Sequence, residues 1–173
     1  NNGLENAIHD YYVAVDREIA RIVELVDDDT LVLVVSDHGA RGMDGGICVN
    51  EWLMREGYLV LKEQPAGIIP LEKAAIDWSR TKAWAAGGYY ARLYLNIAGR
   101  EPEGIVAPED ADALLGELEA KLAALGDEQS NSIGTFSVRP KKVYRSVRNI
   151  APDLIVYFGN LAWRSLGTIG HGV

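Results

Sequence analysis

The 173-residue sequence has little cysteine, fewer basic than acidic residues and no long apolar run. The single cysteine, Cys48, cannot form an internal disulfide, so nothing points to an oxidising compartment. No apolar stretch approaches the ~20 residues that a membrane-spanning helix needs. The 17 basic residues are outnumbered by 25 acidic ones, which gives a formal net charge of -8. Binding to duplex nucleic acid is therefore not expected, because it requires a basic face that displaces counterions.

The residues that are present are those of an ordinary globular chain. A hydrophobic content of 48% and a charged content of 24% are typical of a folded protein with a real core. The acidity does not exclude a phosphate-bearing substrate, because a bound divalent cation can dominate the local field. Asn1 is not an initiator methionine, and the chain stops shortly after His171, inside a glycine-flanked loop. We therefore expect a fragment of a larger protein.

The first forty residues predict a helix followed by a buried strand. Apolar residues recur with helical spacing from Leu4 to Val26, which predicts a helix with one buried stripe. Leu31–Val35 is a run of five aliphatic residues, which favours a strand covered on both faces, as in a parallel sheet. Ligands of such sheets bind at the carboxyl ends of the strands. Asp37 and His38 are therefore expected where an α/β enzyme would hold a metal ion.

The rest of the chain predicts short strands and helices in alternation. We expect a helix over 51–56, capped by Asn50, and a second over 108–125, which opens with a proline and several acids. Strands are expected over 58–61, 81–85, 89–96 and 152–159. The pair Gly87-Gly88 fits a tight turn between two of them. The pattern as a whole indicates an α/β fold.

Three residues are candidate metal ligands: Asp37, His38 and His171. Carboxylate and imidazole groups suit zinc, manganese or iron. Asp37 and His38 are adjacent and could contact one ion, and glycines around His171 leave room for close approach. Alternatively, the adjacent pair caps a helix or bonds to its own loop, since so short a motif also arises by chance.

Several motifs resemble those of one known superfamily. Ser36-Asp37-His38-Gly39 after an aliphatic run, with Gly170-His171-Gly172 far downstream, resembles the alkaline phosphatase superfamily. Within it, the sequence is most similar to the type I phosphodiesterase/nucleotide pyrophosphatase family. Further stretches resemble microbial members of that family: residues 43–53 (MDGGICVNEWL), 87–92 (GGYYAR), 151–159 (APDLIVYFG) and 163–168 (WRSLGT). The resemblance thus extends along nearly the whole chain.

This resemblance implies a fold and a division into domains. The chain should supply part of an alkaline-phosphatase-like central sheet flanked by helices, with a smaller α+β subdomain inserted into it. Residues 1–57 and 132–173 are expected to belong to the metal-binding α/β core. Residues 58–131 are expected to form the inserted subdomain that shapes substrate specificity.

The resemblance also implies a hydrolase with two divalent metal ions, zinc being favoured over manganese. Asp37 and His38 match the pair that holds the metal nearest the nucleophile, and His171 matches the late histidine on the second metal. The nucleophilic Thr or Ser of the family and its remaining ligands cannot be matched in this chain, so they are expected before Asn1. No catalytic nucleophile is therefore expected here, and the chain alone is expected to be inactive.

The implied substrate is a phosphate ester or a nucleotide, cleaved at a phosphodiester or pyrophosphate bond by two-step phosphoryl transfer. Arg41, Asp44 and Asn50 follow the ligand pair closely enough to touch such a substrate, although ordinary loop and capping chemistry also explains them. The middle of the chain is rich in aromatic residues: Trp78, Trp84, Tyr89, Tyr90 and Tyr94. One of them could stack on a base, but packing in a core explains them with less assumption.

Two other readings of the sequence remain open. A phosphomutase, phosphatase or sulfatase relative would share the same metal core, because a fold alone does not separate these chemistries. A non-catalytic binding domain that retained the fold is the alternative from a different class. The sequence does not indicate the oligomeric state.

Overall fold

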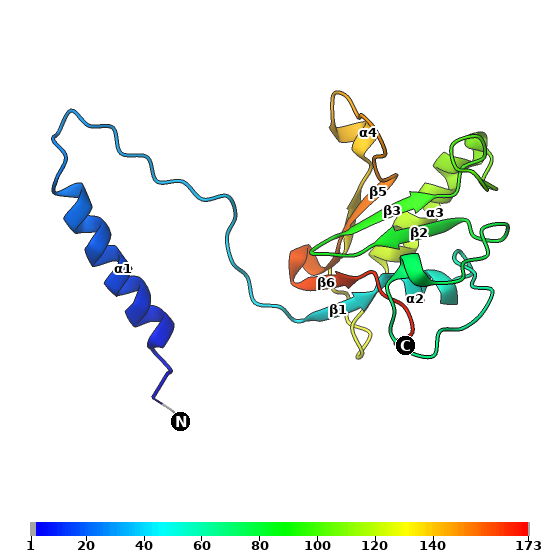
Figure 1. Cartoon of the computed structure of the whole chain (residues 1–173), viewed down its shortest axis with the longest axis horizontal. Coiled ribbons are helices and arrows are strands. Elements are labelled where there is room, and N and C mark those ends of the chain that lie inside the picture. Colours follow the sequence, from blue (N-terminus) through cyan, green and yellow to red (C-terminus); the bar gives the residue numbers. More distant parts are fainter. Residues whose placement is uncertain (1–2, 173) are drawn as a thin grey trace. The chain divides into compact units, whose positions relative to one another are not determined.

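The computed structural model describes residues 3–172. The chain divides between residues 40 and 41 into two compact units, and each is described by itself. Figure 1 shows the elements of both, coloured along the sequence. The alternation of helices and strands confirms the predicted mixed α/β class.

The first unit contains one helix, α1, over Ala7–Val23. The predicted helix is therefore present, but none of its residues is buried, so its apolar stripe is exposed. The run Leu31–Val35 has no regular secondary structure, and Val34 is 95% exposed. The prediction of a buried strand there is wrong. A strand needs a neighbour to pair its backbone groups, and among residues 3–40 the structure describes none.

The second unit contains two sheets. A parallel pair is formed by β1 (Gly45–Cys48) and β6 (Trp163–Leu166), in the register Gly45 to Trp163 and Cys48 to Leu166. The larger sheet is antiparallel, in the order β2-β3-β5-β4. Its strands span Ala83–Ala86 (β2), Ala91–Leu95 (β3), Phe136–Val138 (β4) and Leu154–Tyr157 (β5). The predicted strands over 81–85, 89–96 and 152–159 are thus present as β2, β3 and β5.

Helices of this unit pack on the sheet through one apolar cluster. The α-helices are α2 (Val49–Arg55), α3 (Ala111–Ala123) and α4 (Pro140–Val143). Short 3-10 turns are η1 (Leu71–Lys73), η2 (Pro108–Asp110) and η3 (Phe158–Leu161). The cluster joins Leu53 of α2 and Leu118 and Leu122 of α3 to alternate strand residues such as Leu93 and Val156, all fully buried. Alternation along each strand places these residues on one face of the sheet.

Two local predictions need correction. The segment 58–61 is not a strand; Tyr58 and Leu59 are buried, and only Leu61 forms a bridge, to Ile76. The helix predicted to begin after Asn50 begins at Val49 instead, so Asn50 lies within α2 rather than at its cap. Its side chain makes tertiary hydrogen bonds, which explains why it does not cap the helix.

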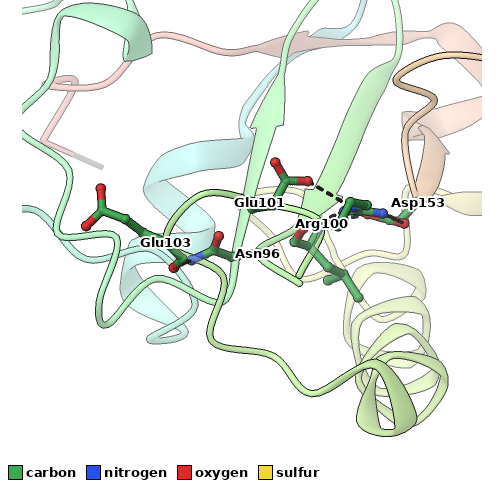
Figure 2. A network of polar contacts seen from close by, with 6 residues as sticks. Asn96, Arg100, Glu101, Glu103 and Asp153 are labelled. Carbon is green, nitrogen blue, oxygen red and sulfur yellow. Dashed lines mark hydrogen bonds and ion pairs between the residues drawn. The ribbon is translucent and has the colours of Figure 1, made fainter. Parts of the chain in front are cut away.

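A polar network fastens the loop after β3 to the start of β5 (Figure 2). The two carboxylate oxygens of Asp153 accept hydrogen bonds from Nη1 and Nη2 of Arg100, each at 2.7 Å. Asp153 also accepts the backbone N–H of Leu95, and Asn96 donates to the carbonyl of Glu103. A bidentate pair of this kind has both strength and directionality. The acid in the 151–159 motif therefore has a structural role in this unit.

Candidate functional site

Asp37 and His38 lie in the first unit, close together and exposed to solvent. The Nε2 of His38 is 3.5 Å from Oδ2 of Asp37, and the two side chains are 81% and 88% exposed. The backbone N–H of His38 donates to Oδ1 of Asp37 at 3.0 Å. Nδ1 of His38 is hydrogen-bonded to the carbonyl of Gly39 at 3.0 Å. Such a bond at one ring nitrogen orients the imidazole and distinguishes the other nitrogen for a further role.

His171 lies in the second unit, on the segment 167–172 that follows β6, which we call the His171 loop. Nε2 of His171 and the hydroxyl of Thr168 form a hydrogen bond of 2.7 Å. Both side chains are half-buried. The imidazole is thus held in a defined orientation by a residue of its own loop.

The backbone of the His171 loop is held by a carboxylate from α2. Oε1 of Glu51 accepts the N–H of Gly170 at 2.6 Å and the N–H of His171 at 2.9 Å. Hydrogen bonds from backbone N–H groups to an ionised carboxylate are short and stronger than neutral ones. Glu51 was not predicted as a site residue. Its sequence signal is weak, because an acid in the first turn of a helix is usually explained by the helix dipole.

Asn50, the neighbour of Glu51, holds the start of the same loop. Its Nδ2 donates to the carbonyl of Gly167 at 2.7 Å and to that of Ala85 at 2.8 Å, and its Oδ1 accepts the N–H of Ala85 at 2.9 Å. The side chain is completely buried. The structure thus gives Asn50 a role in connecting α2, β2 and the His171 loop, and the predicted substrate contact stays a prediction.

Close backbone contacts explain two of the glycines in this region. A Cβ on Gly167 would lie 2.5 Å from the backbone nitrogen of Gly87, so the loop and the β2–β3 turn approach backbone to backbone. Gly170 has a φ of +90°, and a Cβ there would lie 2.2 Å from the carbonyl oxygen of Gly67. Only glycine adopts this backbone conformation without strain. Ile169, between these two glycines in the sequence, is fully buried. Its backbone N–H and carbonyl both form hydrogen bonds with the backbone of Ile69.

A cavity of about 570 Å³ adjoins the His171 loop. Its lining includes Gly167 and Thr168 of the loop, Arg164 and Ser165 of β6, and Trp78 and Trp84. Trp84 packs edge-to-face on Trp78, with ring centroids 5.1 Å apart, and stacks on Tyr94 at 5.6 Å. Both tryptophans are half-buried and pack against the apolar cluster. Both rings thus pack against the apolar cluster and also line the cavity.

Arg41 and Asp44 lie near the start of β1 and are exposed. Nη1 of Arg41 donates to the carbonyl of Asn160 at 2.8 Å. The backbone N–H of Asp44 donates to the carbonyl of Ala162 at 2.7 Å. Cys48 ends β1; burial, and secondarily the nearby Glu51 carboxylate, raises the pKa of its thiol. A raised pKa disfavours the reactive thiolate.

The predicted metal ligands are divided between the two units. Asp37 and His38 belong to one unit and His171 to the other. Within residues 3–172, no group of three or more His, Cys, Asp or Glu side chains could hold a metal ion. The donor types fit zinc or manganese, but neither the adjacent pair of the first unit nor His171 of the second is by itself a complete metal site. The three assignments stay predictions.

Comparisons with known proteins identify the family. Curated proteins and solved structures yield no match to this chain. No helix in the part of the chain that the structure describes is long and apolar enough to cross a membrane. The family model described as Type I phosphodiesterase / nucleotide pyrophosphatase matches residues 3–172, which include the segments of Asp37, His38 and His171. The chain therefore belongs to the type I phosphodiesterase/nucleotide pyrophosphatase family, as its motifs predicted.

Proposed function

We propose that the chain is part of a metal-dependent hydrolase that cleaves phosphodiester or nucleotide pyrophosphate bonds. The observation that carries this proposal is the extent of the family match, which spans residues 3–172 and so covers the segments that contain Asp37, His38 and His171. Membership of a hydrolase family supports phosphoryl chemistry more directly than any single motif does. The substrate is a phosphate ester or a nucleotide.

In this proposal, Asp37 and His38 hold one divalent ion and His171 holds a second, with zinc favoured and manganese as the alternative. Such ions activate a hydroxyl nucleophile and neutralise charge on the phosphoryl oxygens. The nucleophilic Thr or Ser and the other ligands come from sequence outside these 173 residues. The chain by itself is then inactive, because no threonine or serine in it matches the position of the family's nucleophile.

Residues of the second unit orient the ligand His171 and the substrate. Thr168 fixes the orientation of the His171 imidazole through the 2.7 Å hydrogen bond. The cavity beside the loop offers tryptophan rings and Arg164 to the part of a substrate that extends away from the phosphoryl group. A guanidinium and aromatic rings are suited to an anionic, partly apolar ligand.

The proposal is tested by hydrolysis assays on the product of the complete gene. Bis(p-nitrophenyl) phosphate serves as the diester and p-nitrophenyl phosphate as the monoester, with zinc or manganese added. We expect diester turnover that falls at least about 100-fold in the Asp37→Ala variant, because an absent metal ligand removes both affinity and orientation. Asp28→Ala is the matched control: Asp28 is also an exposed acid of the first unit but outside the motif.

Other outcomes would redirect the assignment. Turnover of the monoester alone would indicate a phosphatase or phosphomutase relative. Absence of both activities with metal present would favour a sulfatase or a non-catalytic binding domain. Equal rates for the Asp37→Ala variant and the unchanged protein would refute the metal role of Asp37.

A further inference from the structure

We propose that Glu51 is a positioning residue that holds the His171 loop in the conformation that presents the His171 side chain. This inference rests on the proposed function, because it takes His171 as a functional ligand. It concerns a residue that acts on the loop backbone and not on the substrate.

The first argument is the geometry of the two hydrogen bonds. One oxygen of Glu51 accepts two successive backbone N–H groups, those of Gly170 and His171, at 2.6 and 2.9 Å. The residues that it joins are 119 and 120 positions away in the sequence. Because both donors are backbone groups, the contact fixes the chain that carries the imidazole and is independent of the imidazole itself.

The second argument is that α2 holds the loop at two points. Asn50 donates a hydrogen bond to the backbone carbonyl of Gly167 at the start of the loop. Glu51 receives the N–H groups near the end of the loop. Successive residues of a helix point about 100° apart, so adjacent positions of α2 reach separate parts of the loop. The segment between the two anchors contains Thr168, the hydrogen-bond partner of His171.

The third argument is that the loop backbone has little freedom to replace this anchor. Ile169 is fully buried and paired with Ile69. Gly170 lies against Gly67 at a φ of +90°. Loss of the carboxylate would leave two N–H groups without their acceptor, which favours local rearrangement of residues 170–172.

Three variants of the complete protein separate positioning from charge. Glu51→Gln keeps an oxygen acceptor at the same reach but removes the charge. Glu51→Asp keeps the charge but shortens the reach, and Glu51→Ala removes both. The readouts are hydrogen–deuterium exchange of the peptide covering residues 167–172, measured without added metal, and kcat and KM for bis(p-nitrophenyl) phosphate.

If Glu51 positions the loop, Glu51→Gln keeps near-native exchange protection and activity. Glu51→Asp and Glu51→Ala then exchange faster and lose roughly 10- to 100-fold in kcat/KM, the usual range for a residue that orients a ligand. The reverse order, with Glu51→Asp near native and Glu51→Gln impaired, would overturn the proposal in favour of a charge effect. Native behaviour of all three variants would also overturn it.

A double-mutant cycle with His171→Ala excludes a general folding defect. We expect Glu51→Asp to lower kcat/KM in the unchanged background and to have no further effect once His171 is alanine. Equal losses in both backgrounds, with a lowered unfolding midpoint, would show a structural role only. If His171→Ala leaves hydrolysis unchanged, the proposed function of His171 fails, and the exchange data alone decide whether Glu51 holds the loop.

Discussion

Asn50 shows how one buried amide can connect three parts of the protein. Both its donor and its acceptor groups are used, by the backbone of Ala85 in β2 and of Gly167 in the His171 loop. The side chain is completely buried, so water cannot replace these partners. A buried polar group without a partner costs more than the bond itself contributes. We therefore regard Asn50 as a main determinant of where the His171 loop begins.

The Asn50→Ala variant should be markedly less stable. We expect a loss of about 2–4 kcal/mol in the free energy of unfolding, because the buried N–H and carbonyl of Ala85 and the half-buried carbonyl of Gly167 lose their partner. Urea denaturation measures it. The Asn50→Asp variant is a matched comparison that retains an acceptor for Ala85 but loses the two N–H donors of the amide and buries a carboxyl group, so it should lose at least as much. A loss below about 0.5 kcal/mol in the alanine variant would contradict this account.

At the scale of elements, an arginine clamp ties the end of β4 to α3. Nε and Nη2 of Arg139 donate to the two carboxylate oxygens of Glu119, at 2.8 and 2.6 Å. Nη1 also donates to Asp112 at 3.1 Å. Arg139 is only 11% exposed and Glu119 is 30% exposed, whereas Asp112 is 87% exposed. The pair with Glu119 is thus the shielded one, and the bond from Arg139 lowers the pKa of Glu119 below its ordinary value of 4.5.

This clamp predicts a pH dependence of stability. A carboxyl whose pKa is lowered by folding contributes stability above its unfolded pKa, near 4.5, and that contribution disappears as the pH falls through the folded value. The Glu119→Gln variant should therefore be less stable at pH 7 by about 1–2 kcal/mol, with partial exposure reducing the effect.

Unfolding of both proteins in urea at several pH values checks this. The difference between them should shrink as the pH falls from about 5 towards 3, because Glu119 loses its charge in that window. Asp112→Asn is the control at the same arginine and should change stability by less than about 0.5 kcal/mol. A difference that stays constant down to pH 3 would show that ionisation of Glu119 does not contribute.

At the scale of the whole molecule, the first unit exposes a run of aliphatic residues. Leu31, Val34 and Val35 are each more than 80% exposed. An extended apolar segment with unpaired backbone groups is a template for pairing with another chain. We therefore expect the isolated 173-residue chain to self-associate.

Val34→Lys should weaken this association, because a lysine within an unpaired apolar strand opposes edge-to-edge pairing. Sedimentation velocity over a range of concentrations measures the fraction of associated species. Ala40→Lys adds the same charge at an exposed position outside the run and should leave the association unchanged. If the unchanged chain sediments as a monomer at every concentration, the expectation is wrong.

Local sequence pattern predicted several elements correctly but failed at the apolar run 31–35. The helices at α1 and α3, and the strands β2, β3 and β5, have clear periodicity or runs of apolar residues, and all are present. Strands β1 and β6 were missed, because neither has a run or an alternation of apolar residues that marks a strand. They exist because they pair with each other across more than a hundred residues, which no local pattern reports.

The sequence suggested Asp37, His38 and His171 as ligands because carboxylate and imidazole groups bind metal ions such as zinc, and these assignments stay predictions. It did not indicate which residues hold the His171 loop. Glu51 and Asn50 were not recognised as binding this loop, because an acid and an amide in a short helix have ordinary local explanations. Their roles depend on contacts with the His171 loop, far along the chain.

The sequence by itself determined the family, the mixed α/β class and the candidate ligands, because motifs and short-range periodicity are written into consecutive residues. Only the tertiary structure decided that the His171 loop is held from α2, that Asn50 is buried and not a cap, and that the apolar run 31–35 is exposed. Each of these depends on which surface or backbone group lies opposite a residue. That is a property of the folded chain, since burial and hydrogen bonding require a partner as well as a suitable side chain.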